Sequence, residues 1–289
     1  MYVIIMEEFL LSNKILYISD LDGTLLNSEK EVSDYSRTVI NSLVDKGMHF
    51  TVATARTAAT AVKILSGLKI SAPVVLMNGV VIYDTNKDMY IKTEVIPTAA
   101  VCKIIRIFNK HGISGFMYTI NNDKLVTYYE NLDTQALKEF HDERVHKYNK
   151  NYKRTDSFLD IVEDNNIVYF CMIDEYNKLV GVLNELKAID EIDMVLYKCI
   201  YSEDTWYLEI FSCNASKYNA VKYLREKYKY DRILGFGDNF NDIALLKACD
   251  EFYAVSNGVD ELKEKATGVI GDNCSDGVAK FLEEIHKHS

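Results

Sequence analysis

The first part of the chain alternates short, mainly apolar runs with segments of helical periodicity. The runs at 15–19, 50–53 and 74–77 are typical of buried strands. Between them, residues 33–46 and 58–68 carry an apolar side chain every three or four positions, as an amphipathic helix does. Strands that alternate with helices pair in parallel through right-handed crossovers. We therefore expect an α/β domain with a parallel sheet.

The pattern changes near residue 80. Apolar runs flank turn-forming residues at 84–88 and 121–123, which predicts antiparallel hairpins. Segments of helical periodicity lie among these runs, at 98–110, 134–147 and 176–186. We interpret residues 83–211 as a separate α+β unit that is inserted into the sheet domain.

The alternation typical of a parallel sheet returns after residue 211. Helical segments and apolar runs follow one another at 216–228, 232–236, 241–249, 252–255, 260–266 and 277–286. The sequence therefore predicts a sheet domain made of residues 1–82 and 212–289, interrupted by the inserted unit. The whole chain of 289 residues suffices for two domains of ordinary size.

Composition narrows the classes of partner. The formal net charge of −10 disfavours binding to nucleic acid or to an anionic membrane, because phosphates need basic residues to offset them. The first apolar run is broken by Glu7 and Glu8, so it predicts neither a signal peptide nor a membrane span, and Met6 is an alternative start. Six cysteines without Cys-x-x-Cys spacing predict reduced thiols. We expect a cytoplasmic protein, either a monomer or a homodimer.

Polar residues follow the apolar runs where the strands of the predicted sheet end. They are Asp20 and Asp22, Thr54 and Arg56, Asn78, and the group Asp238, Asn239, Asn241 and Asp242. The carboxyl ends of parallel strands meet at one edge of a sheet, so these side chains should gather in one crevice. Carboxylates gathered there repel each other unless a cation lies between them. Oxygen ligands without histidine or cysteine favour Mg²⁺.

One basic residue is placed to join this group. Lys217 begins a predicted helix directly after Ser216. An ammonium group, a hydroxyl at Thr54, carboxylates around a metal and helix amino termini together form a site for a phosphoryl group.

Each of these parts also has a structural interpretation. Asp20 and Asp22 could form an Asx turn, and Asp238 and Asp242 could cap a helix. Lys217 could be a solvated surface lysine, which is the commonest place for lysine. Arg56 fits a structural ion pair as well as it fits a site residue.

Four short motifs resemble those of the haloacid dehalogenase-like phosphatase superfamily. They are DLDGT at 20–24, ATAR at 53–56, SK at 216–217 and GDNFND at 237–242, in the order of the superfamily. The insertion between the second and third motifs, with MNGV at 77–80 before it and SDGVA at 275–279 near the end, is similar to the Cof-like subfamily. The resemblance covers residues 14–287, and four motifs in order are far more specific than one.

The resemblance implies roles for individual residues. Asp20 would attack phosphorus to form an aspartyl-phosphate, and Asp22 would protonate the leaving oxygen and then activate water. The metal ligands would be the Asp20 carboxylate, the main-chain carbonyl of Asp22, Asp238 and, through water, Asp242. The phosphate contacts would be Thr54, the main-chain amides of Leu21 and Ala55, Lys217 and Asn241. Arg56, Asn78 and Asn239 are further supporting candidates.

The same resemblance implies a Rossmann-like core with an inserted α+β cap, whose closure would exclude water and select the leaving group. The expected function is Mg²⁺-dependent hydrolysis of small phosphorylated metabolites, either sugar phosphates or cofactor or nucleotide monophosphates. A phosphotransferase or mutase with the same aspartyl-phosphate, and a non-catalytic metabolite-binding regulator, are the alternatives. The chain departs from the family pattern at Ala55, at VSNG over 255–258 and at Tyr218, whose bulk would narrow the leaving-group pocket.

Overall fold

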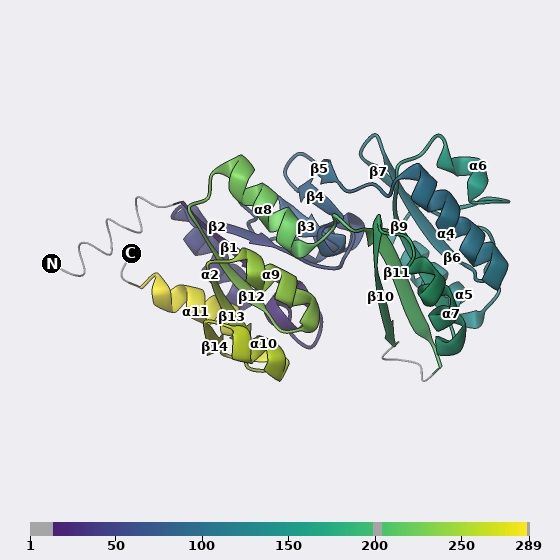
Figure 1. The fold of residues 1–289 in the computed structure, drawn as a ribbon. Helices are drawn as coiled ribbons and strands as arrows, with labels where there is room; N and C mark the ends of the chain where they lie inside the picture. The colour runs from purple at the N-terminus through teal and green to yellow at the C-terminus, as the bar shows by residue number, and fades with distance from the viewer. Residues whose placement is uncertain (1–13, 199–203, 288–289) are drawn as a thin grey trace. The chain divides into compact units, whose positions relative to one another are not determined.

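The computed structural model describes residues 14–198 and 204–287 (Figure 1). The segment 1–13, which the sequence predicts to be no signal peptide, lies outside the described residues. Within the described ranges, none of the helices combines the length and the apolar character that a membrane span requires.

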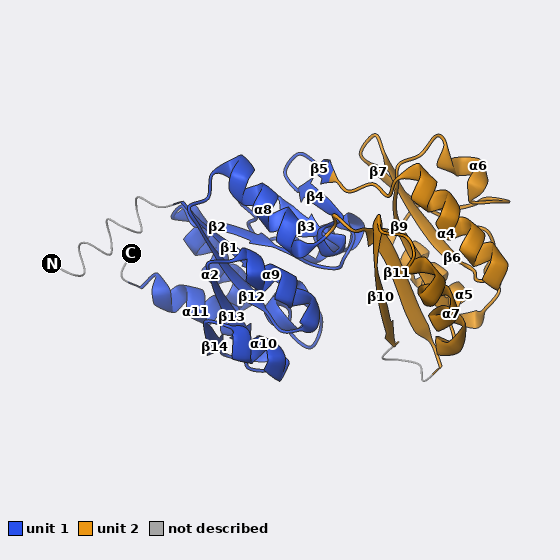
Figure 2. Ribbon diagram, in the orientation of Figure 1, with its two compact units in different colours: residues 1–92, 216–289 blue, residues 93–215 orange. Residues whose placement is uncertain are grey.

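The chain divides into two compact units (Figure 2). The core unit runs up to Lys92 and resumes at Ser216, and the inserted unit is Thr93–Ala215. The sequence placed the boundaries at residues 83 and 211. In the structure the hairpin that begins near residue 81 stays with the core unit, because its first strand pairs with a strand of that unit.

A five-stranded parallel sheet forms the centre of the core unit, with the strand order β14-β13-β12-β1-β2. Its strands are β1 Ile15–Ser19, β2 His49–Val52, β12 Arg232–Gly237, β13 Glu251–Val255 and β14 Gly268–Ile270. Ser19 at the end of β1 is in register with Val52 on one side and with Phe236 on the other. β2, β1 and β12 therefore end together, and the residues after them share one edge of the sheet.

Helices cover both faces of this sheet. They are α2 Asp34–Asp45, α3 Ala58–Ile64, α8 Lys217–Tyr228, α9 Ile243–Ala248, α10 Asp260–Lys265 and α11 Gly277–Ile285. Leu16 and Ile18 of β1 pack with Val221 of α8, whereas Tyr17 contacts the ring of His286 just after α11. Since alternate residues of a strand face opposite sides, α8 and the end of α11 lie on opposite faces.

The third predicted strand does not join this sheet as a full member. β3 Val74–Leu76 pairs antiparallel with β4 Val81–Asp84, and these two form a separate three-stranded sheet with β5 Met89–Thr93. One isolated parallel bridge, between Ala53 and Val75, links β3 to the segment that follows β2. The predicted third strand is therefore present, but its parallel pairing is limited to this one bridge, and its longer pairing is antiparallel with β4.

The inserted unit is a six-stranded mixed sheet with the order β10-β11-β9-β6-β7-β8. Its strands are β6 Gly115–Asn121, β7 Lys124–Tyr129, β8 Tyr152–Arg154, β9 Ile167–Asp174, β10 Ile192–Lys198 and β11 Trp206–Ser212. Its helices are α4 Thr98–His111, α5 Gln135–Tyr148, α6 Leu159–Val162 and α7 Tyr176–Leu186. Met117 of β6 packs with α4 and α7, and the neighbouring Phe116 stacks on Phe140 of α5, so α5 covers the opposite face.

Candidate active site

The candidate site lies in the core unit, at the edge where β1 and β12 end. Asp20 directly follows β1, and its main-chain N–H donates to the carbonyl of Phe236, at 2.9 Å. This bond continues the pairing of β1 with β12 by one residue. The main chain of Asp20 is therefore fixed by the sheet, and the residue is buried.

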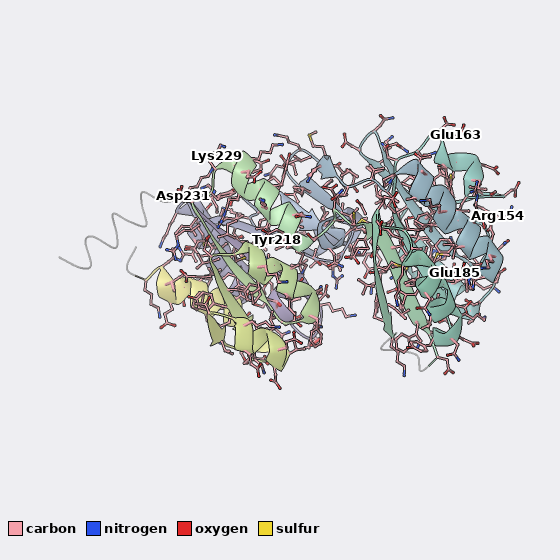
Figure 3. All side chains as sticks on the ribbon, viewed as in Figure 1. Arg154, Glu163, Glu185, Tyr218, Lys229 and Asp231 are labelled. Atoms are coloured by element: carbon pink, nitrogen blue, oxygen red, sulfur yellow. The ribbon has the colours of Figure 1, made fainter. Side chains whose placement is uncertain are left out.

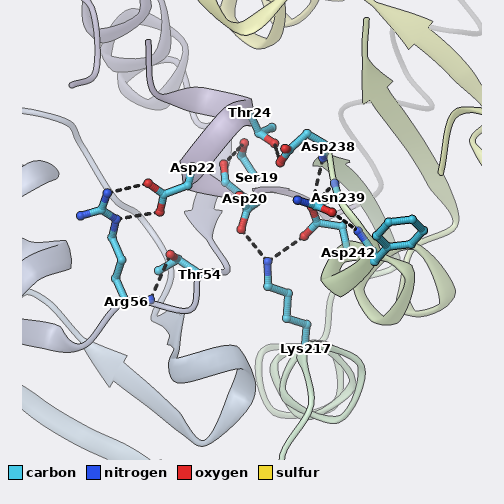
Figure 4. A network of polar contacts seen from close by, with 11 residues as sticks. Ser19, Asp20, Asp22, Thr24, Thr54, Arg56, Lys217, Asp238, Asn239 and Asp242 are labelled. Atoms are coloured by element: carbon cyan, nitrogen blue, oxygen red, sulfur yellow. Dashed lines mark hydrogen bonds and ion pairs between the residues drawn. The ribbon is translucent and has the colours of Figure 1, made fainter. Parts of the chain in front are cut away.

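Lys217 joins two carboxylates at this edge (Figure 4). Its Nζ donates to Oδ1 of Asp20, at 2.5 Å, and to Oδ1 of Asp242, at 2.7 Å. Lys217 is the first residue of α8, and Ser216 before it caps the helix by accepting a hydrogen bond from the N–H of Asn219. The ammonium group is almost fully buried, so this cation is held for the two carboxylates rather than for solvent.

Burial and charge have opposite effects on the pKa values of Asp20 and Lys217. Burial raises the pKa of the Asp20 carboxyl well above its ordinary value, and the Lys217 ammonium acts against that rise. Burial would lower the pKa of Lys217, but the carboxylates of Asp20 and Asp242 outweigh burial and raise it. Lys217 is therefore held in its charged form, and its charge favours the ionised form of Asp20 against burial.

A third carboxylate, Asp238, completes an all-oxygen cluster. One carboxylate oxygen from each of Asp20, Asp238 and Asp242 lies within 4.8 Å of the others, which is close enough for one metal ion to be shared. Burial raises the pKa of Asp238 to about 6, and the nearby carboxylate of Asp242 adds to this rise. The residues therefore fit a hard divalent cation.

Gly23 makes room for this third carboxylate. Its φ is +80°, and a Cβ on it would lie 2.9 Å from Cγ of Asp238 and closer still to Oδ2. Thr24 donates from Oγ1 to Oδ1 of Asp238, at 2.9 Å. Asn257 donates from Nδ2 to the carbonyl of Gly23, at 2.8 Å. Sequence reasoning passed over these three residues, although two belong to the DLDGT motif and Asn257 belongs to VSNG.

Asp242 holds the loop that carries Asp238. Its Oδ2 accepts hydrogen bonds from the main-chain N–H groups of Asp238 and Asn239, at 3.0 and 3.1 Å. Asn239 caps the short 3₁₀ turn Phe240–Asp242, so the turn begins two residues after Asp238. Asn239 and Asn241 are exposed at this turn. Asp242 thus contacts both Lys217 and the loop, which links α8 to the end of β12.

Asp22 and Arg56 form a second group beside the first. Arg56 donates from Nε to Oδ2 of Asp22, at 2.7 Å, and from NH2 to Oδ1, at 2.5 Å. The carboxylate of Asp22 turns toward Arg56, whereas that of Asp20 turns toward Lys217 (Figure 4). Arg56 therefore makes the ion pair that the sequence left open, and its partner is itself a predicted site residue.

The remaining predicted residues line the segment after β2. Thr54 is fully buried, and its Oγ1 accepts a hydrogen bond from the main-chain N–H of Arg56, at 3.2 Å. Asn78 donates from its main-chain N–H to the carbonyl of Thr54, at 3.0 Å. Leu21 is buried in the turn that follows Asp20, and Ala55 is exposed beside Thr54. Figure 3 shows Tyr218, next to Lys217, at the start of α8.

The chain belongs to the haloacid dehalogenase-like hydrolase family, whose sequence model matches residues 17–282. This membership confirms the predicted family, and with it an enzyme of the hydrolase class. The mixed α/β fold with a parallel sheet and an additional sheet-and-helix unit confirms the predicted fold class.

Individual relatives extend over nearly the whole chain. The 5-amino-6-(5-phospho-D-ribitylamino)uracil phosphatase YcsE of Bacillus subtilis is 28% identical over 91% of this chain and 92% of its own length. The pyridoxal phosphate phosphatase YbhA of Escherichia coli is 23% identical, with 91% and 95% covered. The crystal structure of TM0651 from Thermotoga maritima superposes with a TM-score of 0.78 at 25% identity, covering 94% of this chain and 97% of that one.

Proposed function

We propose that this protein is a Mg²⁺-dependent phosphatase of small phosphorylated metabolites that works through an aspartyl-phosphate on Asp20. One observation carries the proposal. The buried carboxylate of Asp20, at the end of β1, lies with two further carboxylates within 4.8 Å, and Lys217 donates to two of the three. A nucleophile, a carboxylate cluster that can hold a metal ion, and a fixed cation are the parts that phosphoryl transfer requires.

In the first step, the free Oδ of Asp20 attacks phosphorus while the bond from phosphorus to the leaving oxygen breaks. Asp22 gives its proton to that oxygen, so the product leaves as an alcohol. In the second step, Asp22 takes a proton from water, which attacks the phosphorus of the aspartyl-phosphate and releases inorganic phosphate. Asp22 must leave Arg56 for these transfers, because both of its oxygens are engaged by Arg56.

The metal would be held by the carboxylates of Asp20 and Asp238 and by the main-chain carbonyl of Asp22, with Asp242 in support. When bound, the metal supplies positive charge against the charge on the phosphoryl oxygens. Lys217 would contact the same oxygens together with Thr54, Asn241 and the amides of Leu21 and Ala55. These groups bind and orient the phosphoryl group, and they need not move protons.

The substrate class is supported by the named relatives. A ribitylaminouracil phosphate and pyridoxal phosphate are both small phosphorylated metabolites. We propose the same class for this chain, with sugar phosphates and cofactor or nucleotide monophosphates as the members to test. The inserted unit would act as the cap that selects the leaving group.

The test is a panel of phosphorylated sugars, nucleotides and vitamin phosphates, with Mg²⁺ present and absent. We expect turnover with Mg²⁺, and we expect Asp20→Asn to lower kcat by about 10⁴-fold or more, because the nucleophile is lost. Asp34→Asn is the matched control, since Asp34 is fully exposed in the first turn of α2. Full activity of Asp20→Asn would refute the nucleophile.

Product analysis separates hydrolysis from its rivals. Inorganic phosphate released in equal amount to the alcohol product supports a phosphatase. Transfer of the group to a second sugar hydroxyl would instead identify a phosphotransferase or mutase. Binding of metabolites without turnover across the whole panel would identify a regulator.

A further inference from the structure

The turn Met77–Gly79, between β3 and β4, has an unusual backbone. φ is 52° at Met77, 55° at Asn78 and 100° at Gly79, so three consecutive residues lie at positive φ. Glycine adopts this region freely and asparagine does so more readily than most residues, but methionine rarely does. A strained backbone persists only where its surroundings over-determine it, and such places cluster at functional sites.

One side of the turn is tied to the segment that carries Thr54. The N–H of Met77 donates to the carbonyl of Arg56, at 3.1 Å, and the N–H of Asn78 donates to the carbonyl of Thr54, at 3.0 Å. The Met77 side chain is buried, with 2% of the residue exposed. The turn therefore cannot shift without also moving Thr54 and Arg56, the residue that pairs with Asp22.

The other side of the turn lies directly against the start of α8. A Cβ on Gly79 would collide with the main-chain carbonyl of Ser216 and lie 2.9 Å from the main-chain nitrogen of Lys217. These are backbone atoms of a helix cap and of the first helical residue, so they cannot rotate away as a side chain could. Gly79 is thus the contact that sets how closely the start of α8 approaches β3.

We infer that the Met77–Gly79 turn is a positioning device for Lys217, and that Gly79 is its positioning residue. The turn fixes the separation between Lys217 on one side and the Thr54 segment on the other. A main-chain shift of about 1 Å would take Nζ out of hydrogen-bonding range of Asp20 or Asp242, because its bonds there are 2.5 and 2.7 Å long. The inference rests on the proposed function, which gives Lys217 and Thr54 to the phosphoryl group.

The first experiment compares Gly79→Ala with Gly47→Ala. Gly47 follows α2 at φ +102°, and nothing lies within 4 Å of a Cβ placed on it. Both substitutions impose the same kind of backbone strain, but only Gly79→Ala meets backbone atoms of Ser216 and Lys217. We expect Gly79→Ala to lower kcat/KM by about 100-fold, as a misplacement of about 1 Å can do, and Gly47→Ala to leave it unchanged.

A double-mutant cycle tests whether the effect passes through Lys217. If Gly79 acts by placing Lys217, then Gly79→Ala should change kcat/KM by less than about threefold in a Lys217→Met background. If the substitution damages the site in some other way, the two losses should multiply, and the inference is overturned.

A second variant covers the case in which Gly79→Ala does not fold. Asn78→Gly keeps the positive φ accessible and adds no atoms, but it loosens the turn. We expect a loss of about tenfold in kcat/KM, with Asn122→Gly as the control, since Asn122 has φ 49° in a hairpin of the inserted unit. An unchanged kcat/KM in Asn78→Gly would overturn the inference in that case.

A crystal structure of the folded Gly79→Ala variant provides a readout that does not depend on activity. We expect Nζ of Lys217 to lie beyond hydrogen-bonding distance of at least one of Asp20 and Asp242. Both bonds retained would overturn the inference. If the wild-type protein hydrolyses no phosphomonoester, the proposed function fails, and this structure still decides the positioning of Lys217.

Discussion

The core unit holds a buried carboxylate and the inserted unit a half-buried one, and the two units compensate these carboxylates differently. Asp20 of the core unit accepts a hydrogen bond from the ammonium of Lys217, at 2.5 Å. Glu209, on β11 of the inserted unit, accepts one from the hydroxyl of Tyr197, at 2.8 Å. Burial raises the pKa of both carboxyl groups, opposed at Asp20 by Lys217 and at Glu209 by hydrogen bonds from Tyr169 and Tyr197.

The difference indicates what each carboxylate is suited for. A neutral hydroxyl stabilises a buried carboxylate less than an ammonium group does, because the hydrogen bond to a cation is charge-assisted. Asp20, with its cation, can be ionised and act as a nucleophile while buried. Glu209 has neutral donors, and Arg144 lowers its pKa only as the weakest of the opposing influences. Three predictions test this comparison.

The largest effect should come from Lys217→Met, which removes the cation and leaves Asp20 and Asp242 facing each other. We expect kcat to fall by about 10²-fold to 10³-fold, as for the loss of one preorganised donor. We also expect the free energy of unfolding at pH 7 to fall by about 3 kcal/mol, because a buried charge loses its partner. Enzyme kinetics and urea titration measure the two quantities.

Lys222→Met is the control for this substitution, since Lys222 is exposed on the same helix. Its free energy of unfolding should stay within about 0.5 kcal/mol of the wild type. If Lys217→Met unfolded at the same urea concentration as Lys222→Met, the ammonium would not be compensating Asp20.

The second-largest effect should be the stabilisation by Mg²⁺, which depends on Asp238, the carboxylate of the cluster to which Lys217 does not donate. At about 100 times its Kd, Mg²⁺ should stabilise the wild type by about 2.7 kcal/mol relative to the protein in EDTA. Asp238→Asn should lose most of this gain, because it removes a ligand oxygen from the cluster. An equal gain in Asp238→Asn and in the wild type, measured by thermal unfolding, would place the metal elsewhere.

The smallest effect should come from Glu209→Gln, read as a function of pH. Burial raises the pKa of Glu209 in the folded chain, so between the unfolded and the folded pKa the folded chain binds more protons than the unfolded one. The wild type should therefore lose stability relative to Glu209→Gln as the pH rises from about 4.5 through the folded pKa.

Urea titrations at several pH values measure this difference. Glu226→Gln, at an exposed position of α8, should run parallel to the wild type. A wild type that gained stability relative to Glu209→Gln over the same pH range would show that the hydrogen-bond donors around Glu209 outweigh burial and lower its pKa, contrary to this prediction.

The sequence predicted best what depends on local signals. The helix expected at 98–110 is observed as α4 Thr98–His111, ended by Gly112 in the left-handed conformation that favours glycine. The helix expected at 216–228 is observed as α8, one residue shorter at its start because Ser216 is the cap. Both ends are specified by residues within the same few positions.

Features that depend on partners far along the chain were harder to predict. β14 Gly268–Ile270 has three residues and no alternation long enough to detect, and it exists because β13 pairs with it. The strand at 74–76 was read correctly, but its pairing with β4 was not, since an apolar run does not specify its neighbour.

The candidate site also has parts that the sequence predicts and parts that it does not. The position of Asp20, Asp238 and Asp242 at strand ends could be expected from the rule for parallel sheets. The ion pair of Asp22 with Arg56, and the place of Lys217 between two carboxylates, could not, because they depend on side-chain rotamers and on the approach of α8.

The pairing of β1 with β12 also constrains how the chain folds. Ser19 and Phe236 are neighbours in space, yet the whole inserted unit separates them along the sequence. On the ribosome, β1 must wait for most of the polypeptide to emerge before its partner exists, while the continuous segment 93–215 can already collapse. Pairing between strands so far apart in the sequence slows assembly of the core unit, so we expect this unit to be most exposed to aggregation late in synthesis.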